Sequence, residues 1–194
     1  MIGFAHRAKG GAVLGASRGD GPFGVAGPSH PAGVRLVPRS ITHPDAQALV
    51  HALYAREMDL RGFADHPETI EPRDYEPPAG LFVLVYHGTV PIGCGGWRTL
   101  PGRTAQITHL YIDAEHRGRG HGRHLLGTLE RTATEAGARR LIVETGNPDI
   151  GALADIGYTP CDPYSRGRDP AVDAAMIKPL FRALGARPLS APPQ

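Results

Sequence analysis

The feature that most constrains this chain is a β-prone run that passes through a glycine-rich turn into an amphipathic helix. Residues 107–112 (ITHLYI) are β-prone, and residues 113–119 form a polar segment that contains glycine. From Gly120 onward, apolar side chains recur at helical spacing: Leu125, Leu126, Leu129, Ala133 and Ala136. When a strand leads through a turn into the first residues of a helix, unpaired backbone N–H groups point at the turn. The positive end of the helix dipole points at the same place. We therefore expect an anion to bind at this turn.

Two familiar phosphate-binding motifs do not fit the turn. A dinucleotide fingerprint that begins at Gly118 needs a third glycine where Arg123 stands, and no Gly-Lys-Ser/Thr follows. The motif that fits is Arg/Gln-x-x-Gly-x-Gly/Ala, at residues 117–122 (RGRGHG). Together with the strand before it (105–112, AQITHLYI) and the run beyond the helix (141–147, LIVETGN), this motif resembles the GNAT superfamily of acetyl-CoA-dependent N-acetyltransferases. The resemblance extends over residues 34–180.

The resemblance implies an α/β fold, the GNAT-like acyl-CoA N-acyltransferase fold, in which helices flank both faces of a central mixed β-sheet. It also implies acetyl-CoA as the cosubstrate, with no metal. In this family the glycine-rich loop holds the pyrophosphate, and the central strand pairs with the pantetheine arm as an added strand would. The implied cofactor-binding residues are Leu110, Tyr111, Ile112, Arg117, Gly118, Arg119, Gly120, His121, Gly122, Arg123 and Asn147.

The chain departs from the family pattern at two catalytic positions. Gln106 stands where the family often has a glutamate general base, and an amide at best orients a water. Leu153 or Ala154 stands where a tyrosine often protonates the leaving thiolate. The catalytic candidates are Gln106, His109 and Glu144, with Glu57 as a further possible base and Tyr158 and Tyr164 as possible acids. A purely structural role remains the alternative for each of them.

Composition argues against other classes of function. A formal net charge of +2 is too small to favour nucleic acid as the main partner. The spacing of His116, His121 and His124 matches no common zinc site. The sequence has two distant cysteines, which favours free thiols in a reducing cytoplasm, and it has no apolar run of membrane length. We expect a cytoplasmic monomer or homodimer whose partner is a small-molecule amine, without nucleic-acid or membrane partners.

The rest of the chain predicts one domain between two tails. We expect a disordered glycine-rich tail over residues 1–33, the N-acetyltransferase domain over 34–182 and a flexible tail over 183–194. The expected elements before the central strand are a strand at 34–37, a helix capped near Thr42 and ending near Gly62, and a hairpin of 81–86 with 90–97. After the central helix we expect a strand at 141–145 parallel to 107–112, a short helix at 149–156, a strand that opens at 157–158 and a last strand at 173–180. Gly95-Gly96 indicates a bulge or a close approach of backbones.

The segment from Ala64 to Gly80 carries five acidic residues against one arginine. By the family resemblance this segment borders the acceptor site, where an acidic rim favours a cationic amine. The sequence therefore predicts acetyl transfer to a primary amine of a small molecule by direct attack. An acetyltransferase for protein or peptide amines and a non-catalytic CoA-binding sensor remain the alternatives.

Overall fold

The computed structural model describes residues 33–62, 71–145, 153–163 and 174–180. Its elements are β1 (Val34–Pro38), α1 (Pro44–Arg61), the 3-10 helix η2 (Pro72–Tyr75), β2 (Gly80–His87), β3 (Val90–Leu100), β4 (Thr104–Ile112), the 3-10 helix η3 (Ala114–His116), α2 (His121–Glu135), β5 (Arg140–Thr145), β6 (Thr159–Cys161) and β7 (Ala174–Pro179). No helix in these ranges is long and apolar enough to span a membrane. The predicted tails and most of the predicted helix at 149–156 lie outside the described residues.

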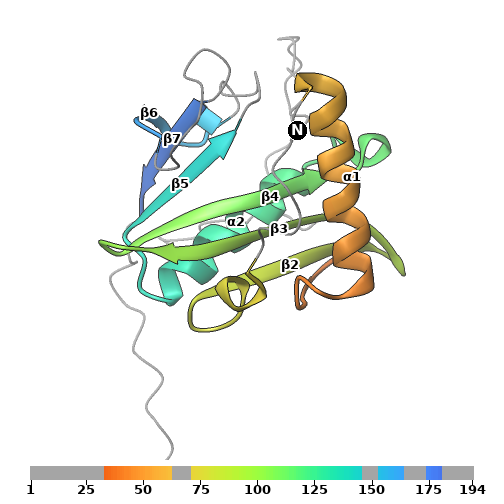
Figure 1. Ribbon diagram of the computed structural model, residues 1–194, viewed down its shortest axis with the longest axis horizontal. Coiled ribbons are helices and arrows are strands. Elements are labelled where there is room, and N and C mark those ends of the chain that lie inside the picture. Colours follow the sequence, from red (N-terminus) through yellow and green to blue (C-terminus); the bar gives the residue numbers. More distant parts are fainter. Residues whose placement is uncertain (1–32, 63–70, 146–152, 164–173, 181–194) are drawn as a thin grey trace, which may run out of the picture.

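One seven-stranded sheet organises the fold, in the order β1-β2-β3-β4-β5-β7-β6. Neighbouring strands pair antiparallel except β4 and β5, which are parallel because α2 connects them as a crossover. Helix α1 covers one face of the sheet and α2 covers the other (Figure 1). The predicted fold, a mixed sheet with helices on both faces, is confirmed.

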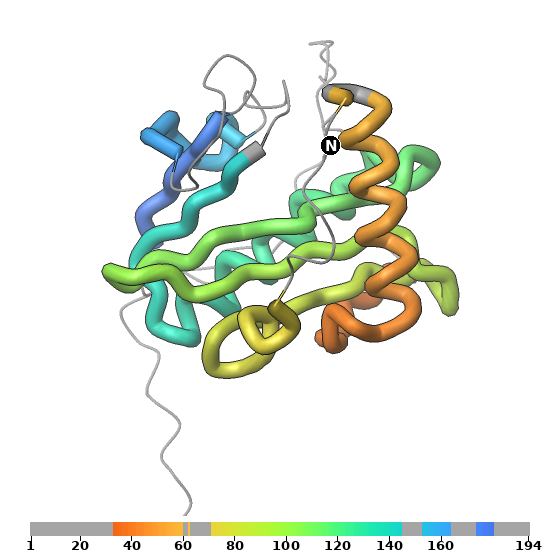
Figure 2. The backbone as a smooth tube through the Cα atoms, in the orientation of Figure 1, coloured from red at the N-terminus to blue at the C-terminus, as the bar shows by residue number. Residues whose placement is uncertain are grey.

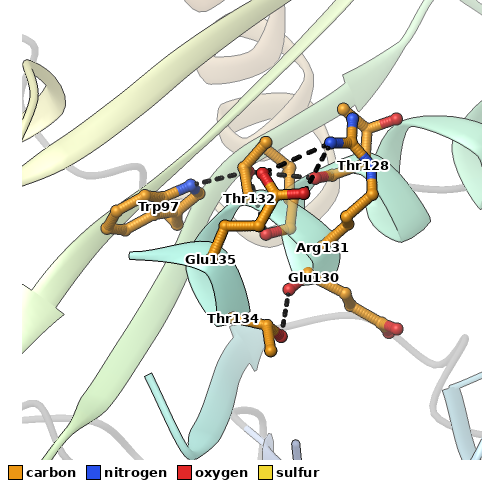
Figure 3. Close-up of polar contacts among 8 residues, drawn as sticks. Trp97, Thr128, Glu130, Arg131, Thr132, Thr134 and Glu135 are labelled. Carbon is orange, nitrogen blue, oxygen red and sulfur yellow. Dashed lines mark hydrogen bonds and ion pairs between the residues drawn. The ribbon is translucent and has the colours of Figure 1, made fainter. Parts of the chain in front are cut away.

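Each face of the sheet has its own apolar core. Leu125, Leu126, Leu129 and Ala133 of α2 are fully buried against one face, as their helical spacing predicts. On this side the indole Nε1 of Trp97 donates to Oγ1 of Thr132 at 3.0 Å, which anchors α2 to β3 (Figure 3). Leu49, Val50 and Leu53 of α1 pack on the opposite face. Strand β2 is buried on both faces, which explains its continuous apolar sequence.

The ends of the helices differ in detail from the sequence prediction. Helix α1 is capped by His43, whose Nδ1 accepts from the backbone N–H of Asp45 at 3.2 Å, and not by Thr42. The predicted end at Gly62 is confirmed, because this glycine adopts a left-handed φ of 73° that suits it to the position. Met58 continues the apolar helical spacing of Leu49, Val50 and Leu53, which predicts a buried position, but it is 50% exposed near the end of α1. Ala136, also expected on an apolar face, is exposed at the end of α2.

Strands β4 and β5 pair over only part of their length. Their register runs from Thr104 opposite Arg140 to Ile107 opposite Val143 and stops there, although both strands continue. Figures 1 and 2 show the two strands leaving a common end and spreading apart toward the end of β4. Beyond Ile107, β4 pairs with β3 alone within the described part of the chain. The parallel arrangement predicted for these strands is confirmed over the four residues of each that pair.

A β-bulge interrupts β4 where the two strands begin to separate. Tyr111 lies opposite Cys94 and Thr108 opposite Gly96, so Gly95 faces two residues, His109 and Leu110. His109 has a φ of 53°, the left-handed conformation that glycine normally supplies in this type of bulge. The predicted irregularity at Gly95-Gly96 is confirmed. The bulge turns the side chains of two successive residues, Thr108 and His109, toward the α1 face of the sheet.

Candidate functional site

The glycine-rich turn has the geometry of an anion site. Gly118 and Gly120 have left-handed φ values of 73° and 84°, and α2 begins at His121 directly after them. The first intrahelical hydrogen bond of α2 is donated by the backbone N–H of His124 to Gly120 O, at 3.0 Å. The amides of His121, Gly122 and the next residue therefore precede the first intrahelical bond. No side chain caps this helix end, and nothing lies within 4 Å of the position that a Cβ on Gly120 would take.

The surroundings of the turn are electropositive. His121 is only 7% exposed, and its pKa is lowered first by burial and then by the positive potentials of His116, Arg119 and His87. Arg119 and Arg123 are exposed on the same turn. The two arginines, together with the α2 dipole, favour a bound anion.

Arg117 connects the turn to the central strand. Its Nε donates to Ile112 O at 2.7 Å, and its guanidinium carbon lies 5.7 Å from the centre of the Tyr111 ring. The sequence predicted Arg117 as a phosphate ligand and Leu110, Tyr111 and Ile112 as backbone partners of the pantetheine arm. Leu110, Tyr111 and Ile112 lie in the part of β4 that does not pair with β5, and Arg117 contacts this part of the strand. The remaining predicted ligand, Asn147, lies outside the described residues.

A chain of polar side chains crosses the α1 face of the sheet from β3 to β5. Arg98 Nε donates to Gln106 Oε1 at 2.9 Å, and Gln106 Nε2 donates to Glu144 Oε2 at 2.8 Å. Arg98 Nη1 also lies 3.6 Å from Asp74 Oδ2 at the end of η2. Gln106 is buried, with 3% of its surface exposed, whereas Arg98, Asp74 and Glu144 are half-buried. Two predicted catalytic residues, Gln106 and Glu144, are thus in direct contact.

The third catalytic candidate, His109, belongs to a separate hydrogen-bonded group. Its Nε2 lies 3.1 Å from the Tyr54 hydroxyl of α1, and its Nδ1 lies 3.0 Å from Thr108 Oγ1. Thr108 Oγ1 is in turn 2.9 Å from the hydroxyl of Tyr75 in η2. The rings of Tyr54, Tyr75 and Phe82 contact the imidazole edge-on. Both ring nitrogens of His109 therefore have hydroxyl partners within the protein.

The backbone strain at His109 leads to a prediction about stability. We expect His109→Gly to be more stable than His109→Ala by about 1 kcal/mol, because only glycine adopts a φ of 53° without a steric penalty. Urea unfolding of the two variants measures the difference. The matched pair Thr108→Gly and Thr108→Ala, at a neighbouring strand position without positive φ, should show the usual opposite order. The same order at both positions would contradict the strained bulge.

Other residues considered from sequence lie away from this site. Tyr158 is buried on the α2 side of the sheet, where its hydroxyl donates to Glu130 Oε1 at 2.9 Å. Burial and the Glu130 carboxylate raise its pKa far above the ordinary value. The structure therefore does not bring Tyr158 together with Gln106 and Glu144, and Tyr164 lies outside the described residues. Among the described residues, no three His, Cys, Asp or Glu side chains gather as a metal site.

Sequence reasoning missed three residues that join the candidates into networks. The helical spacing of Tyr54 predicts only a core position, and no motif marks Tyr75 or Arg98 as a site residue. The pairing of Arg98 with Gln106 could have been predicted from the sequence. The turn at Pro101-Gly102-Arg103 sets Leu100 opposite Thr104 and hence Arg98 opposite Gln106. The contacts of Tyr54 and Tyr75 depend on the positive φ of His109. Gly95-Gly96 predicts an irregularity in β3, but no glycine in β4 indicates which residue adopts the left-handed conformation.

The GNAT acetyltransferase family model matches residues 48–155, more than half of the chain. The chain belongs to this family. The match begins within α1 and extends beyond β5, so it includes both strands that separate and the turn between them. No curated protein matches the sequence significantly.

Solved structures share the GNAT fold at low sequence identity. A GNAT-family acetyltransferase from Staphylococcus aureus Mu50 is 16% identical over 76% of this chain and 99% of its own, with a TM-score of 0.61. A GNAT-family acetyltransferase from Elizabethkingia anophelis with acetyl-CoA bound is 18% identical over 77% and 99%, with a TM-score of 0.54. N-acetylglutamate synthase from Neisseria gonorrhoeae, complexed with coenzyme A and N-acetyl-glutamate, is 18% identical over 76% of this chain and 36% of its own, with a TM-score of 0.58.

Proposed function

We propose that this GNAT protein transfers the acetyl group of acetyl-CoA to a primary amine of a small molecule by direct attack. The observation that carries the proposal is the separation of β4 from β5 beyond Ile107 and Val143, at the same end of the sheet as the uncapped start of α2. The amides of the 117–123 loop hold the pyrophosphate there, and Arg117, Arg119 and Arg123 add charge-assisted hydrogen bonds. The pantetheine arm pairs with β4 at Leu110, Tyr111 and Ile112 and brings the thioester to the point of separation. Structural neighbours that contain acetyl-CoA or coenzyme A support this cosubstrate.

The chemistry sets a requirement for the site. An alkyl amine with a pKa of about 10.4 is mostly protonated at pH 7, and its deprotonation costs about 4–5 kcal/mol. A general base lowers this cost within the transition state. Glu144 and His109, which lie beyond the last pair of β4 with β5, have the chemistry for it, and Glu57 of α1 is the further candidate. Acidic side chains on and beside η2, among them Asp74, favour a cationic acceptor at the same place.

The test is a thiol-release screen with acetyl-CoA across small amines, antibiotics and peptides. We expect coenzyme A release with a small amine, confirmed by the mass of the acetylated product. Release only with peptides would support the alternative of a protein or peptide acetyltransferase. Tight acetyl-CoA binding in calorimetry without release by any acceptor would support a sensor. The screen should include an isosteric alcohol for each amine that reacts, because oxygen acceptors must fail if the proposed chemistry is correct.

We also propose a reducing, cytoplasmic compartment and a monomer or homodimer. The two cysteines support the compartment, because Cys94 and Cys161 are both free thiols and lie on different strands.

A further inference from the structure

The polar chain on the α1 face explains why glutamine replaces the glutamate that the family often has on the central strand. We infer that Arg98 and Gln106 are positioning residues that hold Glu144, on the neighbouring strand β5, as the general base of the reaction. The inference rests on the acetyl transfer proposed above. In this arrangement the general base lies on β5 and not on β4, and Gln106 orients it by a hydrogen bond.

The orientation of the Gln106 amide follows from its two neighbours. A guanidinium only donates hydrogen bonds, and an ionised carboxylate only accepts them. Gln106 lies between one of each, with Arg98 Nε at 2.9 Å and Glu144 Oε2 at 2.8 Å. Its oxygen must therefore face Arg98 and its nitrogen must face Glu144. Because Gln106 is buried and held at both ends, rotation of the amide would lose both bonds at once.

A glutamate at position 106 would accept from Arg98 equally well but would set two carboxylates in contact. Two carboxylates that share a site cannot both ionise at low cost, and the pKa of one rises strongly. Glutamine avoids this conflict and donates to the ionised form of Glu144. Glutamine at position 106 is therefore the better hydrogen-bond partner for a carboxylate at position 144. Asp74 forms an ion pair with the Arg98 guanidinium and so helps to hold it beside Gln106.

The position of Glu144 suits a base that acts on the attacking amine. Glu144 directly follows Val143, the last residue of β5 that pairs with β4, so it lies where these two strands begin to separate. It is half-buried on the α1 face, the side on which Asp74 of η2 lies beside Arg98. His109 is less suited, since its ring nitrogens already face the hydroxyls of Tyr54 and Thr108.

The reaction balances with Glu144 in this role. The amine nitrogen forms a C–N bond to the acetyl carbon, and the C–S bond to coenzyme A breaks. Of the two protons that the ammonium group loses, one passes to the Glu144 carboxylate and then to solvent. The other ends on the coenzyme A thiolate. Gln106 and Arg98 take no proton and act only by orienting the carboxylate.

Steady-state kinetics against pH, with the amine found in the screen, test the inference. Glu144→Gln should lower kcat about 10²- to 10⁴-fold and remove the acid limb of the kcat/KM profile. Gln106→Met, similar in size but without hydrogen bonds, should lower kcat about 10- to 100-fold and leave KM for acetyl-CoA unchanged. Gln106→Glu should move the acid limb to higher pH, because the paired carboxylates retain a proton. A purely structural role for Gln106 would not move that limb.

The exposed pair Arg131 and Glu135 on α2 supplies matched controls (Figure 3). Arg131→Met and Glu135→Gln should leave kcat and the pH profile unchanged, whereas Arg98→Met should lower kcat as Gln106→Met does. Arg98 is half-buried, so this variant remains informative if a change at Gln106 impairs folding. Wild-type protein that acetylates no amine would contradict the proposed function and this inference together. Transfer by the wild type with an unaltered acid limb in Glu144→Gln or Gln106→Glu would contradict this inference alone.

Discussion

Replacing Gly120 by aspartate is expected to weaken acetyl-CoA binding about 100-fold, which is about 2.7 kcal/mol. Gly120 is the residue before α2, with a φ of 84° and open space where a Cβ would stand. The new carboxylate would occupy the place assigned to the pyrophosphate. It would also neutralise the positive end of the helix that the site uses. Isothermal titration calorimetry with acetyl-CoA measures the loss.

Gly120→Asn separates charge from backbone strain in this experiment. Asparagine and aspartate are nearly isosteric and both tolerate the left-handed conformation better than other side chains. We expect the Asn variant to bind acetyl-CoA at least about tenfold more tightly than the Asp variant, and the gap should narrow as salt screens the charges. Equal affinities for the two variants would show that no phosphate lies at this turn.

The sequence was informative wherever structure is decided locally. The run from Ile107 to Ala136 predicted a strand, a glycine-rich turn and a helix, because β-propensity, turn glycines and helical spacing each depend on nearby residues. The end of α1 at Gly62 and the hairpin turn at Gly88 follow for the same reason. The boundaries were less accurate. Strand β3 continues to Leu100 and β4 starts at Thr104, because pairing with each other extends both strands beyond their apolar cores.

The candidate site was less predictable because it depends on pairing between distant segments. Glu144 and His109 are each predicted as ionisable groups near the central strand, but the contacts that hold them join distant segments. Glu144 is bonded to Gln106 of β4, which Arg98 of β3 holds in turn, and His109 is bonded to Tyr54 of α1. His109 has a positive φ that sequence does not signal, since glycine is the usual residue there. Without the bulge, alternation would turn His109 toward the opposite face from Thr108. The contact of Gln106 with Glu144 likewise needs the register of two parallel strands joined by a long crossover.

A second large effect is expected at Gly80, where alanine should destabilise the protein by about 3 kcal/mol. Gly80 begins β2 and lies beneath η2, and its N–H donates to Glu76 O at 3.0 Å. A Cβ there would clash with the backbone carbonyl oxygens of Asp74 and Trp97. Neither oxygen belongs to a flexible side chain, so η2 or β3 must shift to admit a methyl group. A shift of η2 would also move Asp74 away from Arg98 and disturb the polar chain that leads to Glu144.

Gly127→Ala is the matched control for this substitution. Gly127 lies within α2, and nothing lies within 4 Å of the position that its Cβ would take, so the same added methyl group has room. Alanine at this helix position should stabilise the protein by about 0.5–1 kcal/mol, because it restricts the unfolded chain more than glycine does. Urea unfolding should therefore place the two alanine variants on opposite sides of the wild type. If Gly80→Ala were as stable as the wild type, the close packing of η2 on β2 and β3 would be wrong, and with it the placement of Asp74 beside Arg98.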